Sequence, residues 1–254
     1  MRDGSGSTAT KNVYKKGYHV TEATVLTDSN HPVSIFSEIH SSKEKNFTSI
    51  NDVTFSAMER AKALFGKAAF VMDRGYDDNK MFLKLDSMGQ DYVIRLTAKR
   101  KLLYHNKWVF LVYGITEHPM MLATNKEIQS KDDVIKAAKL YFSRWKIEEY
   151  FRCKKQVFQL ENFRVRKLKA INALNFYITL CMAFLGHISM KSETNMLKVA
   201  IIRTADPIKG KIAFCYYRLA KGIPGILSYA KEGIKRWFRT RRPAYRQLCL
   251  KLAV

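Results

Sequence analysis

The first regular pattern along the chain is an alternation of apolar and polar residues on either side of a short turn. The segments GYHVTEATVLTD and PVSIFSEIHSS alternate in this way around SNHP. A period of two is typical of strands that bury one face, so residues 17–42 are predicted to form a β-hairpin. Residues 49–65 change to helical periodicity, and Gly66 is a residue type that can end the predicted helix.

Short apolar runs follow, with a helix between the first two. KAAFVMD is a continuous apolar run of the kind found in buried strands, and it ends at Asp73 before the turn Arg74–Tyr76. DDNKMFLKLDSM predicts a helix, with Asp77 or Asp78 near its start. DYVIRLTA and MMLATN predict strands, and KRKLLYHNKWVFLVYG between them predicts a short ribbon.

The C-terminal half reads as helices alone. Ser130, with Asp133 three residues later, is a plausible N-cap for one long helix over about residues 132–155. A second helix is predicted over 167–190, where polar residues interrupt the apolar stretch and favour a buried helix over a membrane span. Basic helices follow from about residue 195. The order of elements predicts an α/β fold, with helices on both faces of one core and a helical C-terminal extension.

Charge is high and unevenly distributed. The chain carries a formal net charge of +23, of which residues 128–254 contribute +19 and residues 1–127 only +4. Such an excess predicts attraction to a polyanion, most often nucleic acid, bound mainly by the C-terminal half. The four cysteines show no C-x-x-C spacing and the six histidines are scattered, so the pattern indicates neither a zinc site nor a redox couple.

Four residues on the predicted long helix carry most of the functional information. Tyr141, Arg144, Glu148 and Lys155 are separated by three, four and seven positions, which places them on one face of an α-helix. A carboxylate among phosphate-binding groups suits metal-assisted chemistry on a nucleic-acid backbone. The alternative for Glu148 alone is a solvated acid paired with a nearby arginine.

Asp73 is the second candidate acid, because it lies where an apolar strand ends. Ligands of open α/β sheets meet the fold at the carboxyl ends of strands. Asp73 and Glu148 could therefore converge on one divalent cation, and Mg²⁺ prefers such hard oxygen ligands. The alternative for Asp73 alone is an N-cap or turn residue.

At these positions the chain resembles a known family. The spacing Y-x2-R-x3-E-x6-K, formed here by Tyr141, Arg144, Glu148 and Lys155, is the signature of DDE transposases of bacterial insertion sequences, in the insertion sequence 4 family. FVMDRGYD, around Asp73, is similar to the region of that family's second catalytic Asp. The resemblance covers roughly residues 17–190.

The resemblance implies a ribonuclease-H-like mixed sheet flanked by helices, and an Asp-Asp-Glu triad that binds Mg²⁺ or Mn²⁺. Asp73 would be the second acid and Glu148 the third, while Arg144, Lys155 and Tyr141 would contact DNA. The implied reaction is hydrolysis at the transposon end, followed by attack of the freed 3′-hydroxyl on target DNA. The implied partner is double-stranded DNA, bound by a homodimer in the bacterial cytoplasm at the nucleoid, with no membrane partner.

The chain also departs from the family pattern. The family's first Asp lies on a strand before the hairpin, whereas this chain opens with a polar segment in which Asp3 is the only acid. We therefore expect a truncated copy that lacks the first catalytic strand and its Asp, in which the fold can be inherited while the activity is lost. The expected divisions are a flexible segment over 1–16, a catalytic domain over 17–190 and a basic helical region over 191–254. The alternative function is that of a non-catalytic DNA-binding remnant.

Overall fold

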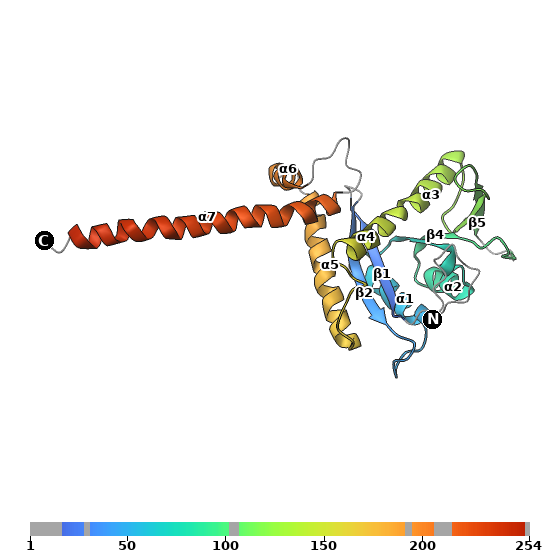
Figure 1. The fold of residues 1–254 in the computed structure, drawn as a ribbon. Coiled ribbons are helices and arrows are strands. Elements are labelled where there is room, and N and C mark those ends of the chain that lie inside the picture. Colours follow the sequence, from blue (N-terminus) through green and yellow to red (C-terminus); the bar gives the residue numbers. More distant parts are fainter. Residues whose placement is uncertain (1–16, 28–30, 102–106, 191–194, 206–214, 252–254) are drawn as a thin grey trace.

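The computed structural model describes residues 17–27, 31–101, 107–190, 195–205 and 215–251 (Figure 1). Within these ranges the N-terminal half alternates strands and helices, and the C-terminal half is helical. This order, with a mixed sheet flanked by helices, confirms the predicted α/β fold and is consistent with a ribonuclease-H-like architecture. The predicted flexible segment 1–16 lies outside the described residues.

A hairpin forms the first layer, as the alternating pattern predicted. Strands β1 (His19–Leu26) and β2 (Pro32–His40) pair antiparallel, from His19 opposite His40 to Leu26 opposite Pro32. The register shifts at a bulge between Ala23 and Thr24. Within the described residues these strands form a sheet of two, so β1 leaves one edge without a neighbouring strand.

The second sheet has four strands in the order β3-β4-β6-β5. Strands β3 (Ala69–Met72) and β4 (Asp91–Arg95) are parallel, while β6 (Met120–Thr124) is antiparallel to both β4 and β5 (Trp108–Val112). The predicted ribbon over 99–114 is described only in part. Its second half is strand β5, which pairs with β6. Residues 102–106 lie outside the described ranges, so the ribbon itself stays a prediction.

Helices cover both faces of the four-stranded sheet. On one face, α1 (Ile50–Phe65) and α2 (Asn79–Ser87) bury a core that includes Met58, Leu85 and Tyr92. On the other face, α3 (Lys131–Ser143) packs against Val93 and Leu122. The predicted cap of α3 is present, because Ser130 Oγ accepts the Asp133 N–H and the Asp133 carboxylate accepts the Ser130 N–H. Asp78, the second of the two candidates, caps α2.

The predicted long helix is interrupted at Arg144, which is a correction. Helix α3 ends at Ser143, and α4 (Trp145–Gln156) begins directly after Arg144. The Arg144 N–H donates to Tyr141 O at 3.1 Å and the Ile147 N–H donates to Arg144 O at 3.0 Å, which are the tighter i to i−3 bonds of a 3₁₀ turn. Because Arg144 keeps right-handed helical angles (φ −53°, ψ −31°), the chain continues in nearly the same helical course.

The remaining helices are α5 (Leu168–Met190), α6 (Asn195–Thr204) and α7 (Tyr216–Lys251), and α7 projects far from the body (Figure 1). Helix α5 packs against β2 and α7. By length and composition α5 could span a membrane. It was predicted to be buried, but only one of its faces is, because its other side exposes an apolar stripe of Leu174, Phe176, Tyr177, Leu180 and Phe184.

Candidate functional site

Asp73 lies where the sequence placed it, at the carboxyl end of β3. It also caps the short 3₁₀ helix η1 (Arg74–Tyr76), since its Oδ1 accepts the Arg74 N–H at 2.6 Å. Asp73 is therefore an N-cap residue, as the alternative hypothesis expected, and its position at a strand end also leaves it suited to bind a ligand. The cap fixes the carboxylate where a ligand of an open α/β sheet would be met.

Arg144 is the central cation of the site, at the junction of α3 and α4. Its Nη1 lies 2.8 Å from Glu148 Oε1, one helical turn later. The Arg144 side chain is only 14% exposed, whereas the Glu148 side chain is 52% exposed. Arg144 Nε is buried, and no hydrogen-bond partner for it is found among the described residues. Arg144 therefore has a buried N–H donor, at Nε, that its ion pair with Glu148 does not use.

Both candidate acids, Asp73 and Glu148, affect the pKa of Arg144. Burial acts to lower the pKa of Arg144, but Tyr141, Asp73 and Glu148 together outweigh it and raise that pKa above its usual value. Burial raises the pKa of Tyr76, and the charge of Asp73 raises it further. Asp73 and Glu148, 75 positions apart in the chain, therefore act on the same guanidinium.

Asp73 and Arg144 also line one cavity of about 500 Å³, together with Tyr76. Glu148 is not among the residues that line it and reaches the site through its ion pair with Arg144. The lining is polar where the end of β3 meets the junction of α3 and α4, and most of the other lining residues are apolar.

The other two residues of the four-residue pattern lie in different environments. Tyr141 is 2% exposed, its hydroxyl has no partner among the described residues, and its ring centroid lies 5.7 Å from the guanidinium carbon of Arg144. Lys155 is exposed in the last turn of α4, and its Nζ lies 2.6 Å from Glu161 Oε1. Lys155 therefore faces solvent and an anionic ligand could reach it, whereas Tyr141 supports Arg144 from the core.

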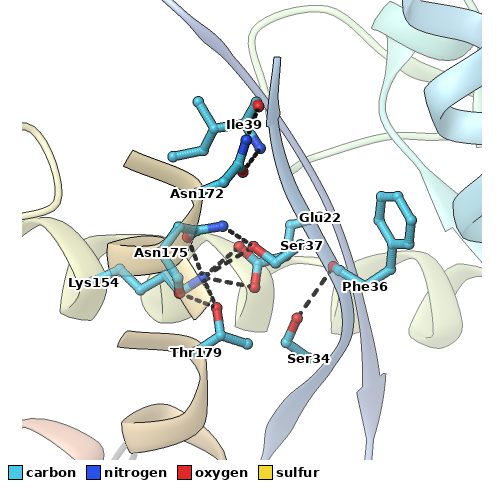
Figure 2. Close-up of polar contacts among 9 residues, drawn as sticks. All are labelled: Glu22, Ser34, Phe36, Ser37, Ile39, Lys154, Asn172, Asn175 and Thr179. Atoms are coloured by element: carbon cyan, nitrogen blue, oxygen red, sulfur yellow. Dashed lines mark hydrogen bonds and ion pairs between the residues drawn. The ribbon is translucent and has the colours of Figure 1, made fainter. Parts of the chain in front are cut away.

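No pattern in the sequence indicated the buried ion pair beside the site. Lys154 Nζ lies 2.8 Å from Glu22 Oε2, and both side chains are completely buried (Figure 2). Burial lowers the pKa of Lys154, and Glu22 opposes that shift. Lys154 Nζ also donates to two side-chain oxygens of α5, the hydroxyl of Thr179 and the amide oxygen of Asn175. This network ties α4, which carries Glu148, to β1 and α5.

The site offers two carboxylates, Asp73 and Glu148, to a divalent cation. Within the ranges that the structure describes, no group of three or more His, Cys, Asp or Glu side chains could hold a metal ion. Mg²⁺, however, is often bound through one or two carboxylates together with waters and substrate phosphates. Asp73 and Glu148 fit that smaller donor set if Glu148, which is half exposed, turns from Arg144 toward the ion.

Comparison with known families gives a match over residues 3–184, to the model described as the transposase DDE domain. The match spans more than half of the chain and includes Asp73, Arg144 and Glu148. A comparison with curated proteins found no match.

Proposed function

The chain belongs to the family of DDE transposases, and from this premise we propose that it cuts and joins DNA strands at the ends of an insertion sequence of the insertion sequence 4 family. The observation that supports this proposal is that Asp73 and Glu148 both interact electrostatically with Arg144, which lines one cavity together with Asp73. Two acids and a buried guanidinium suit phosphoryl chemistry, in which positioning and charge stabilisation supply most of the catalysis.

Each residue has a distinct role in the proposed reaction. Asp73 and Glu148 would hold Mg²⁺ or Mn²⁺, and family members generally use divalent ions. When bound, the cation polarises phosphoryl oxygens and activates the attacking oxygen. Arg144 would exchange Glu148 for a backbone phosphate, to which its fork of donors is well matched. Tyr141 would act as a positioning residue, because its buried ring lies beside the guanidinium.

DNA would be held by charge outside the reacting centre. Lys155 is exposed on the same helix as Glu148, and residues 128–254 carry +19 of the net charge. Contacts to phosphates position a protein on a duplex without reading its sequence. We propose double-stranded DNA as the partner, a homodimer as the form bound to it, and the bacterial cytoplasm, at the nucleoid, as the location. We also propose that the catalytic domain ends at about residue 190 and that a basic helical region follows it.

The proposal is tested by Mg²⁺-dependent nicking of a duplex that carries the DNA flanking the coding sequence. We expect nicking by the unmodified chain and its loss in Asp73→Asn and Glu148→Gln. Glu149→Gln is the matched control, since Glu149 pairs with Arg152 and lies off the line of Arg144. Nicking that survives Glu148→Gln would overturn the site, and salt-sensitive DNA binding without any nicking would identify a non-catalytic DNA-binding protein.

A further inference from the structure

Helix α5 has its polarity reversed relative to an ordinary surface helix. Its polar side chains face the body of the protein, where Asn172 pairs with both backbone groups of Ile39. Asn175 and Thr179 accept hydrogen bonds from Lys154 on the same side (Figure 2). The outward face carries the apolar stripe, although a surface helix normally turns its polar residues to solvent. The outward face of α5 therefore has the composition of a surface that another molecule covers.

The apolar stripe is large and uncharged. Phe176, Tyr177, Leu180 and Phe184 are between 54% and 62% exposed. No Asp, Glu, Lys or Arg occurs in residues 170–190. With rings that bury about 150–250 Å² each when fully covered, the stripe exposes on the order of 500 Å². Two such stripes in contact would bury about 1,000 Å², the size at which specific protein interfaces begin.

The spacing of the exposed residues on α5 is that of a helix-pairing seam. Positions four, three, four and three residues apart are exposed, and they are occupied by Ala173, Tyr177, Leu180, Phe184 and His187. This repeat is the a and d pattern of helices that pack side by side at a shallow angle. A helix with the same spacing is therefore the best-fitting occupant of the stripe.

The charges around α5 favour a second copy of this chain in the antiparallel orientation. Two chains of net charge +23 repel each other, and the uncharged stripe is a surface at which they can meet without opposing cations. The cations beside α5 gather at its first turn and just before it, at Arg164, Arg166, Lys167 and Lys169. Antiparallel pairing holds these two clusters about 30 Å apart. That separation is several times the screening length of roughly 8 Å at physiological salt, whereas parallel pairing would place the clusters side by side.

We propose that α5 is the interface of a homodimer, in which the apolar stripes of two copies pack antiparallel about a two-fold axis near Leu180. Leu180 then contacts Leu180 of the second copy, and Tyr177 contacts Phe184 of the second copy, as an isologous interface requires. This interface deepens the proposed function, because it rests on the homodimer proposed there. It requires neither DNA nor a metal ion, since the contact is apolar.

The first test measures the oligomeric state of the full chain without DNA or metal ions. Sedimentation velocity over a series of protein concentrations should show a reversible equilibrium between monomer and dimer. Cys181 is exposed beside Leu180, whereas Cys153 and Cys215 are buried. In a Cys249→Ser background, a short bis-maleimide should therefore link Cys181 to Cys181 of the second copy, and Cys181→Ser should abolish the link.

Variants at the two-fold axis locate the contact. Leu180→Lys should weaken the dimer at least about tenfold, because it opposes two like charges in a desolvated contact. Leu83→Lys is the matched control, since Leu83 is 67% exposed on α2, and it should dimerise normally. A mixture of Leu180→Lys with Leu180→Glu should recover the dimer as a heterodimer, which only a contact of residue 180 with its own counterpart would produce.

Several results would overturn the proposal. A chain that stays monomeric and forms no Cys181 link would show that the stripe does not bind a second copy. Equal weakening by Leu83→Lys would show non-specific association, and a dimer unaffected by Leu180→Lys would place the interface elsewhere. Binding of a monomer to phosphatidylglycerol vesicles, lost in Leu180→Lys, would assign the stripe to a membrane surface.

The proposed function fails or stands separately. A dimer linked through Cys181 that does not nick DNA would support the interface and contradict the proposed catalysis. Nicking by a strictly monomeric chain would do the reverse.

Discussion

Lys154 Nζ donates hydrogen bonds to both carboxylate oxygens of Glu22, at 2.9 and 2.8 Å, and neither side chain is exposed to solvent. The two residues are 132 positions apart, so the pair fastens α4 to the hairpin. Figure 2 shows that the same ammonium group is also surrounded by acceptors, which are the side-chain oxygens of Thr179, Asn175 and Ser37. The helix that carries Glu148 is thereby held in place by charge as well as by packing.

Removing one partner of this pair should be far more damaging than removing both. We expect Lys154→Met to lower the free energy of unfolding by about 3–5 kcal/mol, because it leaves Glu22 buried and uncompensated. The double variant Lys154→Met with Glu22→Leu should recover much of that loss. Urea unfolding measures both values. A loss below about 1 kcal/mol in the single variant would contradict a desolvated ion pair.

The hydroxyl of Tyr141 should be dispensable for stability, whereas its ring should not. The hydroxyl is buried without a partner among the described residues, so Tyr141→Phe is expected to leave the free energy of unfolding unchanged or to raise it by up to about 1 kcal/mol. Tyr141→Ala is expected to cost about 3–5 kcal/mol through the cavity it leaves. If Tyr141 acts only through Arg144, Tyr141→Phe should also bind DNA normally in a fluorescence titration. Weaker DNA binding by the Phe variant would show a direct contact of the phenol.

Acid should destabilise the hairpin through His40. This side chain is buried, its Nε2 lies 2.9 Å from Thr21 Oγ1, and burial lowers its pKa, with Glu44 opposing. Because the folded-state pKa lies below 6.5, the unfolded chain binds the proton more readily. Stability should therefore be complete above about pH 6.5 and fall as the pH drops below it.

The midpoint of urea unfolding at pH 7.5 and at pH 5.5 measures this dependence. His40→Gln should reduce the difference between the two midpoints, and His118→Gln, at an exposed position, should not. A residual difference in His40→Gln is expected from His19, because burial, the largest cause, still lowers the pKa of His19 when the charge of His40 is removed. An identical difference in His40→Gln and the unmodified chain would contradict the assignment to His40.

Lys155 should contribute to DNA affinity through salt-dependent electrostatics. If its ammonium contacts a phosphate, Lys155→Ala should weaken binding more at low salt than at high salt and reduce the slope of log K against log salt by about 1. Lys67→Ala, at an exposed lysine paired with Asp91, is the control. Glu161→Gln should strengthen binding, because Glu161 competes for Lys155 in the free protein. An unchanged slope in Lys155→Ala would exclude the phosphate contact.

Local patterns were enough to predict most of the elements. The alternation of residues 17–42 predicted the hairpin, the apolar runs predicted β3, β4 and β6, and the Ser130–Asp133 spacing predicted the start of α3. These features depend on neighbours in sequence, which is why they can be read without a structure. The pairing of β5 with β6 was not predicted, because strand partners are chosen by the sheet as a whole.

The chemical groups of the site can be identified from the sequence alone: the strand-end acid Asp73 and the helical series from Tyr141 to Lys155. The direction in which each group points depends on the packing of the folded chain. Adjacent helical residues differ by about 100° around the axis, so Lys154 faces Glu22 in the core while Lys155 faces solvent. The cavity between β1 and β3 was likewise invisible in the sequence, because it depends on how two sheets and three helices pack, and no local period records that packing.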